Sequence, residues 1–437
     1  MLYFVFLSNH CALSCPSYLF GEDLASLVGS ARKDIFLFAL SNEDVNSWVK
    51  LPLQIDPVDN DGHIIFSENI QNLLEKPLVK EDRMIFYTKD FGRPIRSGDI
   101  FPCNATSTLI KTITSNYEIQ DSLFFKKYAY LGFCKESPDK AIPQTSSEKM
   151  NFNLTERRVE SDRYVYFFSS DNHMLFNKIL FKVNESESEA VIKQNEIANS
   201  SDMIIRADIR NFFLMMFGKH DVESELESYM KGPIALSAKV SFFLKILFFR
   251  IKLQLSTDVS FFPDSANIPM MVTIPVDAKK YLHPKSGILY SWNSASNIEV
   301  KVKESQMPFI NPELFDNDRK KLQKIGLKRC VRDYCFYRAE FILMGHLLAM
   351  NFTLPRYLVE KGFFPFYVPN IYDFSEKMGW TTFEKQENVS QPKKIGMYFE
   401  TSGLPEGNHP WDFWMTLGTK KNTWQASCPH PVKLKKM

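Results

Sequence analysis

Glycine is scarce in this sequence: 17 of 437 residues, roughly 4 % against a usual value near 7 %. Phosphate-binding loops depend on glycine, and neither G-x-x-x-x-G-K-[ST] nor G-x-G-x-x-G occurs in the chain. The G-x-S-x-G motif of a nucleophile elbow is also missing. These absences argue against a nucleotide-binding enzyme and give no support for a serine hydrolase.

Net charge is also small, at +2, although 24 % of the residues are charged. A strongly basic nucleic-acid binder is excluded on that ground, and we expect no nucleic-acid partner. Hydrophobic residues make up 44 % of the chain, which is enough for a sizeable core and excludes a wholly disordered protein.

The seven cysteines include no Cys-x-x-Cys pair, so a zinc ribbon is not indicated. Cys330 and Cys335 form either a small loop disulfide or two buried thiols. Six Asn-x-Ser/Thr sequons exceed the roughly three expected by chance, which favours a secretory compartment. The candidate N-glycosylation sites are Asn104, Asn153, Asn184, Asn199, Asn351 and Asn388.

Candidate metal ligands are few, and no H-E-x-x-H motif occurs. Asp59, Asp61 and His63 form a small polar cluster in a Pro-flanked loop, which indicates either a metal site or a solvated turn. D-x-D triplets at 59–61 and 316–318 have the spacing that holds a divalent cation against a sugar nucleotide. The second triplet precedes the basic run RKKLQK, where helix capping explains it equally well.

Aromatic residues are abundant, with 38 phenylalanines, and they favour β-structure. Short apolar runs at 34–40, 84–88, 163–168 and 203–209 predict buried strands. From about residue 256 the segments are short, turn-bounded and often alternating. In WDFWMT, for example, Trp411, Phe413 and Met415 fall on one face of a strand. Residues 395–402 and 411–417 predict a β-hairpin with a long loop, and 334–350 predicts a helix.

Residues 234–255 (IALSAKVSFFLKILFFRIKLQL) are long enough to span a membrane, but four basic side chains interrupt them. A basic residue near the bilayer centre costs about 2.5–3.5 kcal/mol, so a buried or interfacial helix is expected instead. The predicted organisation is an N-terminal region of unknown type (1–150), a mixed α/β segment (151–233), this apolar basic helix (234–255) and a β-rich domain (256–437). The predicted fold class is α+β or mixed, with a C-terminal antiparallel β-sandwich-like domain and a less defined mixed α/β N-terminal region.

An ordered set of segments carries a resemblance to a known family. The segments are SFFPDSANIP, KKYLHPKSGILYSW, GFFPFYVPN after a Cys-x4-Cys pair, KKIGMYFETSG and PWDFWMTL. Together they resemble the C-terminal lumenal domain of the endoplasmic reticulum metallopeptidase family over about residues 256–430. That family carries zinc, but no H-x-D pair and no adjacent Glu-Glu occurs here for its metal ions and general base. We therefore assign no catalytic residue, no metal ligand and no cofactor to this chain, and leave open whether it is an enzyme.

The resemblance implies a non-catalytic lumenal or accessory β-domain related to an ER membrane zinc metallopeptidase. Such a domain acts through packing and partner contact, with a membrane or membrane-embedded partner, in the ER or the secretory pathway. One alternative is a Golgi or ER glycosyltransferase that uses a sugar nucleotide, since NEIANSSDMIIRAD and HPKSGIL resemble parts of sialyltransferase motifs. The other alternative is a secreted or lumenal interaction glycoprotein.

Overall fold

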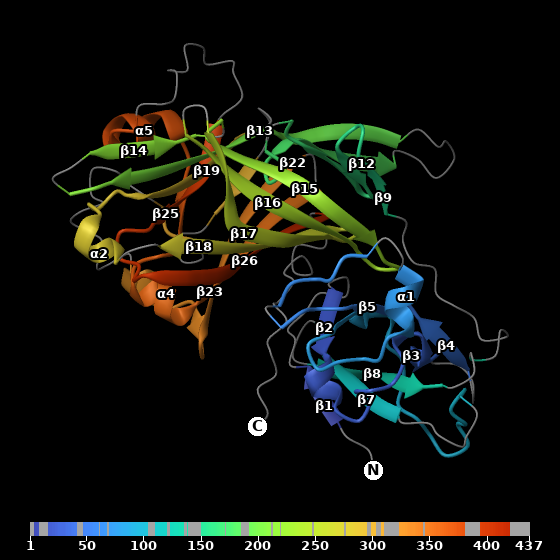
Figure 1. Ribbon diagram of the computed structural model, residues 1–437. Helices are drawn as coiled ribbons and strands as arrows, with labels where there is room; N and C mark the ends of the chain where they lie inside the picture. The colour runs from blue at the N-terminus through green and yellow to red at the C-terminus, as the bar shows by residue number, and fades with distance from the viewer. Residues whose placement is uncertain are drawn as a thin grey trace. The chain divides into compact units, whose positions relative to one another are not determined.

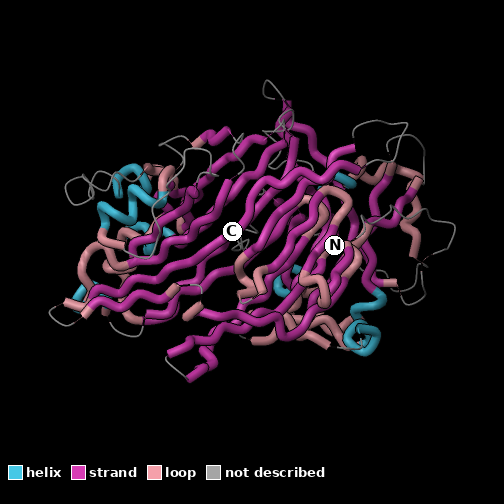
Figure 2. Tube along the Cα trace, turned by 90° about the horizontal axis from the view of Figure 1, so that it is seen from above, coloured by secondary structure: helices cyan, strands magenta, loops and turns pink. Residues whose placement is uncertain are grey.

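The computed structural model describes residues 4–419 apart from gaps, of which the longer are 8–15, 104–109, 139–149, 185–191, 310–322 and 381–393. Strands dominate the described part, and its helices are short (Figure 2). The fold is therefore mixed and β-rich with large antiparallel sheets, as predicted. The α-helices are α1 (Ile70–Glu75), α2 (Ala278–Tyr281), α4 (Arg356–Glu360) and α5 (Ile371–Met378).

The chain divides into two compact units (Figure 1). The first contains the described residues of 1–149 together with 228–237, and the second contains those of 150–227 and 238–423. The first unit holds a five-stranded sheet and a three-stranded sheet. The strand order of the five-stranded sheet is β1 (Phe4–Leu7), β7 (Ile110–Ile119), β8 (Leu123–Phe133), β3 (Ile35–Leu40) and β4 (Trp48–Leu51). The strand order of the three-stranded sheet is β2 (Pro16–Phe20), β6 (Arg83–Tyr87) and β5 (Gln54–Asp56).

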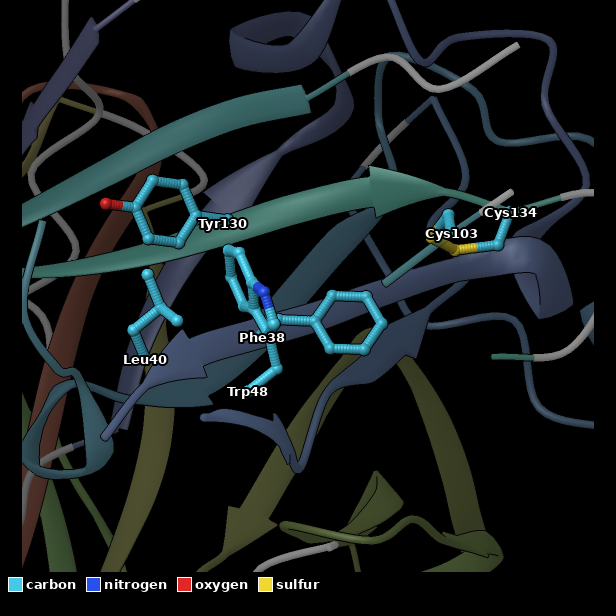
Figure 3. Packing of buried hydrophobic residues seen from close by; sticks show 6 residues of the cluster. All are labelled: Phe38, Leu40, Trp48, Cys103, Tyr130 and Cys134. Atoms are coloured by element: carbon cyan, nitrogen blue, oxygen red, sulfur yellow. A yellow bond between two sulfur atoms is a disulfide. The ribbon is translucent and has the colours of Figure 1, made fainter. Parts of the chain in front are cut away.

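An aromatic cluster packs against the five-stranded sheet of the first unit (Figure 3). The Trp48 ring makes edge contacts with Phe38 and Tyr130 at centroid distances of 6.4 and 5.5 Å. Its indole N–H is buried with them and donates to the carbonyl of Ile100 at 2.7 Å. A disulfide between Cys103 and Cys134, which the sequence did not predict, belongs to the same cluster.

The second unit contains two nine-stranded sheets, except that the end of β15 and the start of β16, within 228–237, belong to the first unit. Sheet I consists of β24 (Pro365–Val368), β25 (Lys394–Glu400), β19 (Gly287–Ser294), β13 (Ile192–Asp208), β12 (Phe176–Asn184), β11 (Tyr164–Phe168), β10 (Arg158–Glu160) and β9 (Asn151–Asn153), with β14 (Leu214–Phe217) beside β13. Sheet II consists of β15 (Val222–Lys231), β16 (Leu236–Ile246), β17 (Phe249–Phe261), β18 (Ser265–Ile274), β26 (Gly407–Thr419), β23 (His346–Pro355), β22 (Tyr334–Leu343) and β20 (Glu299–Lys301), with β21 (Cys330–Val331) beside β22.

Aromatic side chains hold the two sheets of the second unit face to face. The ring of Phe352 on β23 lies 5.6 Å from that of Phe399 on β25. Phe341 on β22 meets Trp292 on β19 at 5.5 Å, and Phe261 on β17 contacts strand β11 in the same way. The abundance of phenylalanine therefore has a structural role in this sandwich, since such rings bury large apolar areas.

Residues 234–255 are not helical, and the predicted helix is wrong. They lie mainly in strands β16 and β17, and no helix in the described part of the chain has the length and hydropathy of a membrane span. Polar residues occupy every second position from Arg250 to Ser260, the period of a strand with one polar face. The basic side chains pair with glutamates of β15: Arg250 with Glu223 at 2.8 Å, and Lys252 with Glu227.

Two further element predictions are wrong. Residues 334–350 form β22 and the first half of β23, where buried Cys335, Tyr337, Ala339 and Phe341 alternate with half-buried side chains. Residues 395–402 and 411–417 do not form a hairpin, because β25 belongs to sheet I and β26 to sheet II. Sheet I also joins strands of 151–217 with strands of 287–400, so the expected segment 151–233 and domain 256–437 share one sandwich.

A loop of sheet I closes the β15 edge of sheet II. The Asn172 side-chain amide donates to the Val222 carbonyl at 2.6 Å, and its carbonyl oxygen accepts from the Ser224 hydroxyl at 2.5 Å. His173 continues this contact, since its Nδ1 accepts from the backbone N–H of Leu226 at 2.9 Å. The loop thereby satisfies backbone groups that an edge strand would otherwise expose.

We expect acid to weaken this edge contact. Burial, with a smaller effect of Arg157, lowers the pKa of His173 below its ordinary 6.5. The unfolded chain therefore binds a proton at a higher pH than the folded chain does. The contribution of His173 to the free energy of unfolding is fully present above about pH 6.5. It decreases as the pH falls below that value, until His173 is also protonated in the folded chain. His173→Gln keeps an acceptor for Leu226 that does not titrate, so thermal unfolding between pH 7.5 and 5 should show a weaker pH dependence in the variant. An unchanged pH dependence would contradict this role for His173.

Candidate binding site on sheet II

A row of polar side chains crosses the centre of sheet II. Ser260 on β17 lies opposite Asn267 on β18, which lies opposite Trp414 on β26. Trp414 in turn lies opposite Asn351 on β23, and Asn351 opposite Arg338 on β22. Directly paired residues of antiparallel strands project from the same face, so these five side chains share the outer face of the sandwich. We call them the polar row.

Strand alternation puts the row on this face. Asn351 stands between Met350 and Phe352, which are buried on the side of sheet I. In β26, Phe413 and Met415 flank Trp414 in the same way, so the predicted division of WDFWMT between two faces is confirmed. The apolar neighbours therefore fix the polar side chains on the opposite face through the period of the strand.

Several buried side chains of this face have a polar atom that makes no hydrogen bond within the described part of the chain, among them those of Asn267, Asn351 and Thr353. Asn267, Asn351 and Thr353 are 5 %, 8 % and 4 % exposed. The side-chain nitrogens of the two asparagines and the hydroxyl of Thr353 make no hydrogen bond with the part of the chain that the structure describes. A buried polar group in this state costs about 1–3 kcal/mol, and such groups are rare in native proteins. Their concentration on adjoining strands marks this face as the candidate site.

The surroundings orient the amides and supply an aromatic ring. Arg338 donates to Glu340 at 2.7 Å and to the Asn351 amide oxygen at 3.4 Å, so the Asn351 nitrogen keeps its donors for another acceptor. Trp414 stacks on Phe262 with ring centroids 5.8 Å apart. The hydroxyl of Tyr164 on sheet I donates to the Phe262 carbonyl at 2.9 Å and so positions that ring, and burial raises the pKa of Tyr164 well above its usual value.

This arrangement is suited to binding. It offers amide donors, a hydroxyl that both donates and accepts, and carboxylates at Asp412 (opposite Thr353) and Glu340. The cation Arg338 is already paired with Glu340, which leaves no excess positive charge in the row. In the described part of the chain, no group of His, Cys, Asp and Glu side chains is placed to hold a metal ion.

The predicted glycosylation sites have different surroundings. Asn351 and Thr353, which form one sequon, are both buried in the candidate site. Asn153 accepts a hydrogen bond from the backbone of Glu156, and Asn199 donates to Glu196. Asn104 and Asn388 lie outside the described residues, as does the side chain of Asn184. Glycosylation at all six sites stays a prediction.

The remaining candidates are not brought together with this site. Cys330 and Cys335 form a disulfide where β21 pairs with β22. Asp59 closes a turn, since its side chain accepts from the backbone N–H of His63 at 2.9 Å. Asp61 and the triplet at 316–318 lie outside the described residues. Sequence reasoning missed Asn267 and Thr353 as site residues, although each is a polar residue on the polar side of a strand.

No family model matches this chain, and no curated protein matches it. Among solved structures it is similar to an α-mannosidase from Enterococcus faecalis V583, with a TM-score of 0.33, 7 % identity and coverage of 92 % of this chain and 45 % of that one. It is also similar to a protein in the glycosyl hydrolase family 38 from Enterococcus faecalis, with a TM-score of 0.33, 6 % identity and coverage of 91 % of this chain and 46 % of that one. A third similar structure is a putative kojibiose phosphorylase from human microbiome, with a TM-score of 0.24, 10 % identity and coverage of 63 % of this chain and 32 % of that one. The chain spans less than half the length of each, and at these TM-scores the likeness does not establish a shared activity.

These findings correct the expected family and function. Membership of the ER metallopeptidase family is wrong: neither a family model nor a curated protein of that family matches the chain. The non-catalytic lumenal domain deduced from it is wrong for the same reason. The glycosyltransferase alternative is wrong too, because the second unit is an antiparallel sandwich. The interaction-glycoprotein alternative finds no matching family model or curated protein either. The expected absence of cofactor and nucleic acid and the secretory location stay predictions.

Proposed function

We propose that this chain binds a neutral carbohydrate on the outer face of sheet II. The observation that supports this proposal is the set of buried, unpartnered polar atoms on Asn267, Asn351 and Thr353. Replacing them with apolar residues would make the sandwich more stable, so their presence is best explained by a ligand that completes their hydrogen bonds. Residues kept at the expense of stability are typical of binding and catalytic sites.

The chemistry of the row favours a sugar over a charged ligand. Sugar hydroxyls both donate and accept, which suits two amide donors beside a hydroxyl and carboxylates. A phosphate or carboxylate ligand needs uncompensated positive charge, whereas the row has Arg338 paired with Glu340 and Asp412 close by. The indole of Trp414 adds a flat apolar surface of the kind that lines small-molecule sites. Since the row is buried, the ligand enters only when covering atoms move, and association should be slower than about 10⁵ M⁻¹s⁻¹.

Asn267→Leu tests the proposal with a matched control. We expect this variant to lose at least tenfold in affinity for a neutral oligosaccharide and to unfold at an equal or higher temperature, because it removes an unpartnered buried amide of similar volume. Thr353→Val should behave in the same way. Asn172→Leu is the control: its amide is equally buried but fully hydrogen-bonded, so we expect a loss of about 1–3 kcal/mol in stability and unchanged affinity.

Binding is measured by calorimetry against neutral oligosaccharides of glucose, mannose and galactose, with oligogalacturonate as the charged comparison. The proposal fails if the wild-type chain binds none of the neutral sugars, or if Asn267→Leu and Thr353→Val bind them as well as wild type does. A lower unfolding temperature for Asn267→Leu would show that the amide has a structural partner after all.

A further inference from the structure

Strand β14 is apolar and yet buries neither of its faces. Leu214 is 47 % exposed, Phe213 just before the strand is 57 % exposed, and Met215, Met216 and Phe217 are half-buried. Among the described strands β14 pairs only with β13, beyond the main path of sheet I. A strand in a sandwich normally buries one face against the core. Exposed apolar surface of this kind marks a contact site.

Basic and aromatic side chains adjoin this apolar strand. The turn that leads into β14 is fixed to the end of α2, since the Arg210 backbone and side chain donate to the carbonyls of Tyr281 and Leu282 at 2.9 and 3.0 Å. Lys279 and Lys280 on α2 are exposed, and Tyr281 is 41 % exposed. The Lys280 ammonium lies 5.2 Å from the centre of the Tyr281 ring. Apolar, basic and tyrosyl groups thus form one contiguous surface.

We propose that this surface docks onto an anionic lipid bilayer. The side chains of β14 enter the boundary between head groups and acyl chains, where apolar groups on a basic element bind. Arg210, Lys279 and Lys280 then lie at the level of the anionic head groups, each strengthening binding electrostatically. Tyr281 suits the same depth, because its ring is apolar and its hydroxyl stays hydrated. The charge of the surface disfavours a second copy of this chain, which would bring like charges together.

Co-sedimentation with vesicles tests this docking. We expect the full chain to pellet with vesicles that contain phosphatidylserine and much less with pure phosphatidylcholine. Lys279→Glu/Lys280→Glu should reduce partitioning onto the phosphatidylserine vesicles by about ten- to thirty-fold or more, because each basic side chain near the surface contributes to binding. Phe213→Ser/Leu214→Ser should reduce it on both kinds of vesicle. All four side chains are exposed, so the fold should be retained, which circular dichroism checks.

Matched controls replace equally exposed residues elsewhere. Leu154→Ser and Val331→Ser change side chains that are 55 % and 65 % exposed, and Lys33→Glu/Lys80→Glu changes lysines that are 51 % and 73 % exposed. These variants should partition like wild type. Equal pelleting of wild type with both vesicle types, or equal losses in controls and test variants, would overturn the proposal. The proposal would also be overturned if the wild-type chain were a dimer that does not bind vesicles and that Phe213→Ser/Leu214→Ser converts to a monomer. The test is independent of carbohydrate binding.

Discussion

Arg32→Met should lower the free energy of unfolding of the first unit by about 3–5 kcal/mol. Arg32 and Asp82 are 5 % and 0 % exposed and form two hydrogen bonds, of 2.7 and 3.0 Å. The third guanidinium nitrogen of Arg32, Nη1, donates to the Leu73 carbonyl at 2.8 Å. Loss of the guanidinium leaves the Asp82 carboxylate buried with only the backbone N–H groups of Val58 and Val79 as donors.

The neighbouring residue provides the control for this prediction. Lys33 pairs with Glu75 at 3.6 Å, but their side chains are 51 % and 66 % exposed. Exposed pairs contribute about 0–1 kcal/mol, so Lys33→Met should change stability little. Arg32→Met/Asp82→Leu should recover much of the loss, because it removes the stranded charge. Urea unfolding followed by Trp48 fluorescence measures these changes; a loss below about 1 kcal/mol in Arg32→Met would show that water reaches Asp82.

The predominance of strands could be predicted from the sequence, but the pairing of those strands could not. Apolar runs and the alternation of Trp411, Phe413 and Met415 indicated strands directly, since the period of a strand is local. Partners such as Asn267 and Trp414 are distant in the chain, and nothing local sets their register. The hairpin predicted between 395–402 and 411–417 failed for this reason: adjacency in sequence did not produce adjacency in one sheet.

The helix expected at 234–255 is wrong because the composition of this segment suits a helix whereas its polar period is that of a strand. Phe, Leu and Ile with four interspersed basic residues suit an amphipathic helix by composition alone. The alternation from Arg250 to Ser260 already indicated a strand with a polar face. What the sequence could not reveal is that glutamates of β15 neutralise that face, as Glu223 does for Arg250. The cost of placing charged side chains in a bilayer argued against a membrane-spanning helix. The described residues contain no helix that is long and apolar enough for one, a finding that does not contradict that argument.

The candidate site was hidden by a competing motif. Asn351 and Thr353 match a glycosylation sequon, a signal that needs only three residues and assumes exposure. Their neighbours Met350, Phe352 and Leu354 instead indicated a half-buried strand with both polar side chains on one face. That reading places them beside each other, but only strand register adds Asn267 and Trp414. A binding site assembled across strands is therefore visible only in the folded chain.

Phe352→Ala should lower the free energy of unfolding of the second unit by about 3–5 kcal/mol. This side chain is 4 % exposed, and its ring centre lies 5.6, 6.0 and 5.0 Å from those of Phe399, Trp411 and Phe413. Truncation leaves a cavity between the two sheets, which a close-packed interior fills only in part. Phe213→Ala removes the same atoms from a side chain that is 57 % exposed and should change stability by less than about 0.5 kcal/mol.

Phe352 also links the core to the candidate site, because it stands between Asn351 and Thr353 on the same strand. Phe352→Leu keeps most of the buried volume, so it should lose less than about 1.5 kcal/mol and retain sugar affinity. Phe352→Ala lets β23 shift toward the cavity and should weaken both stability and binding. Calorimetric unfolding and sugar titration of the two variants separate these effects. If Phe352→Ala binds sugar as wild type does, then the apolar core does not set the position of the polar row.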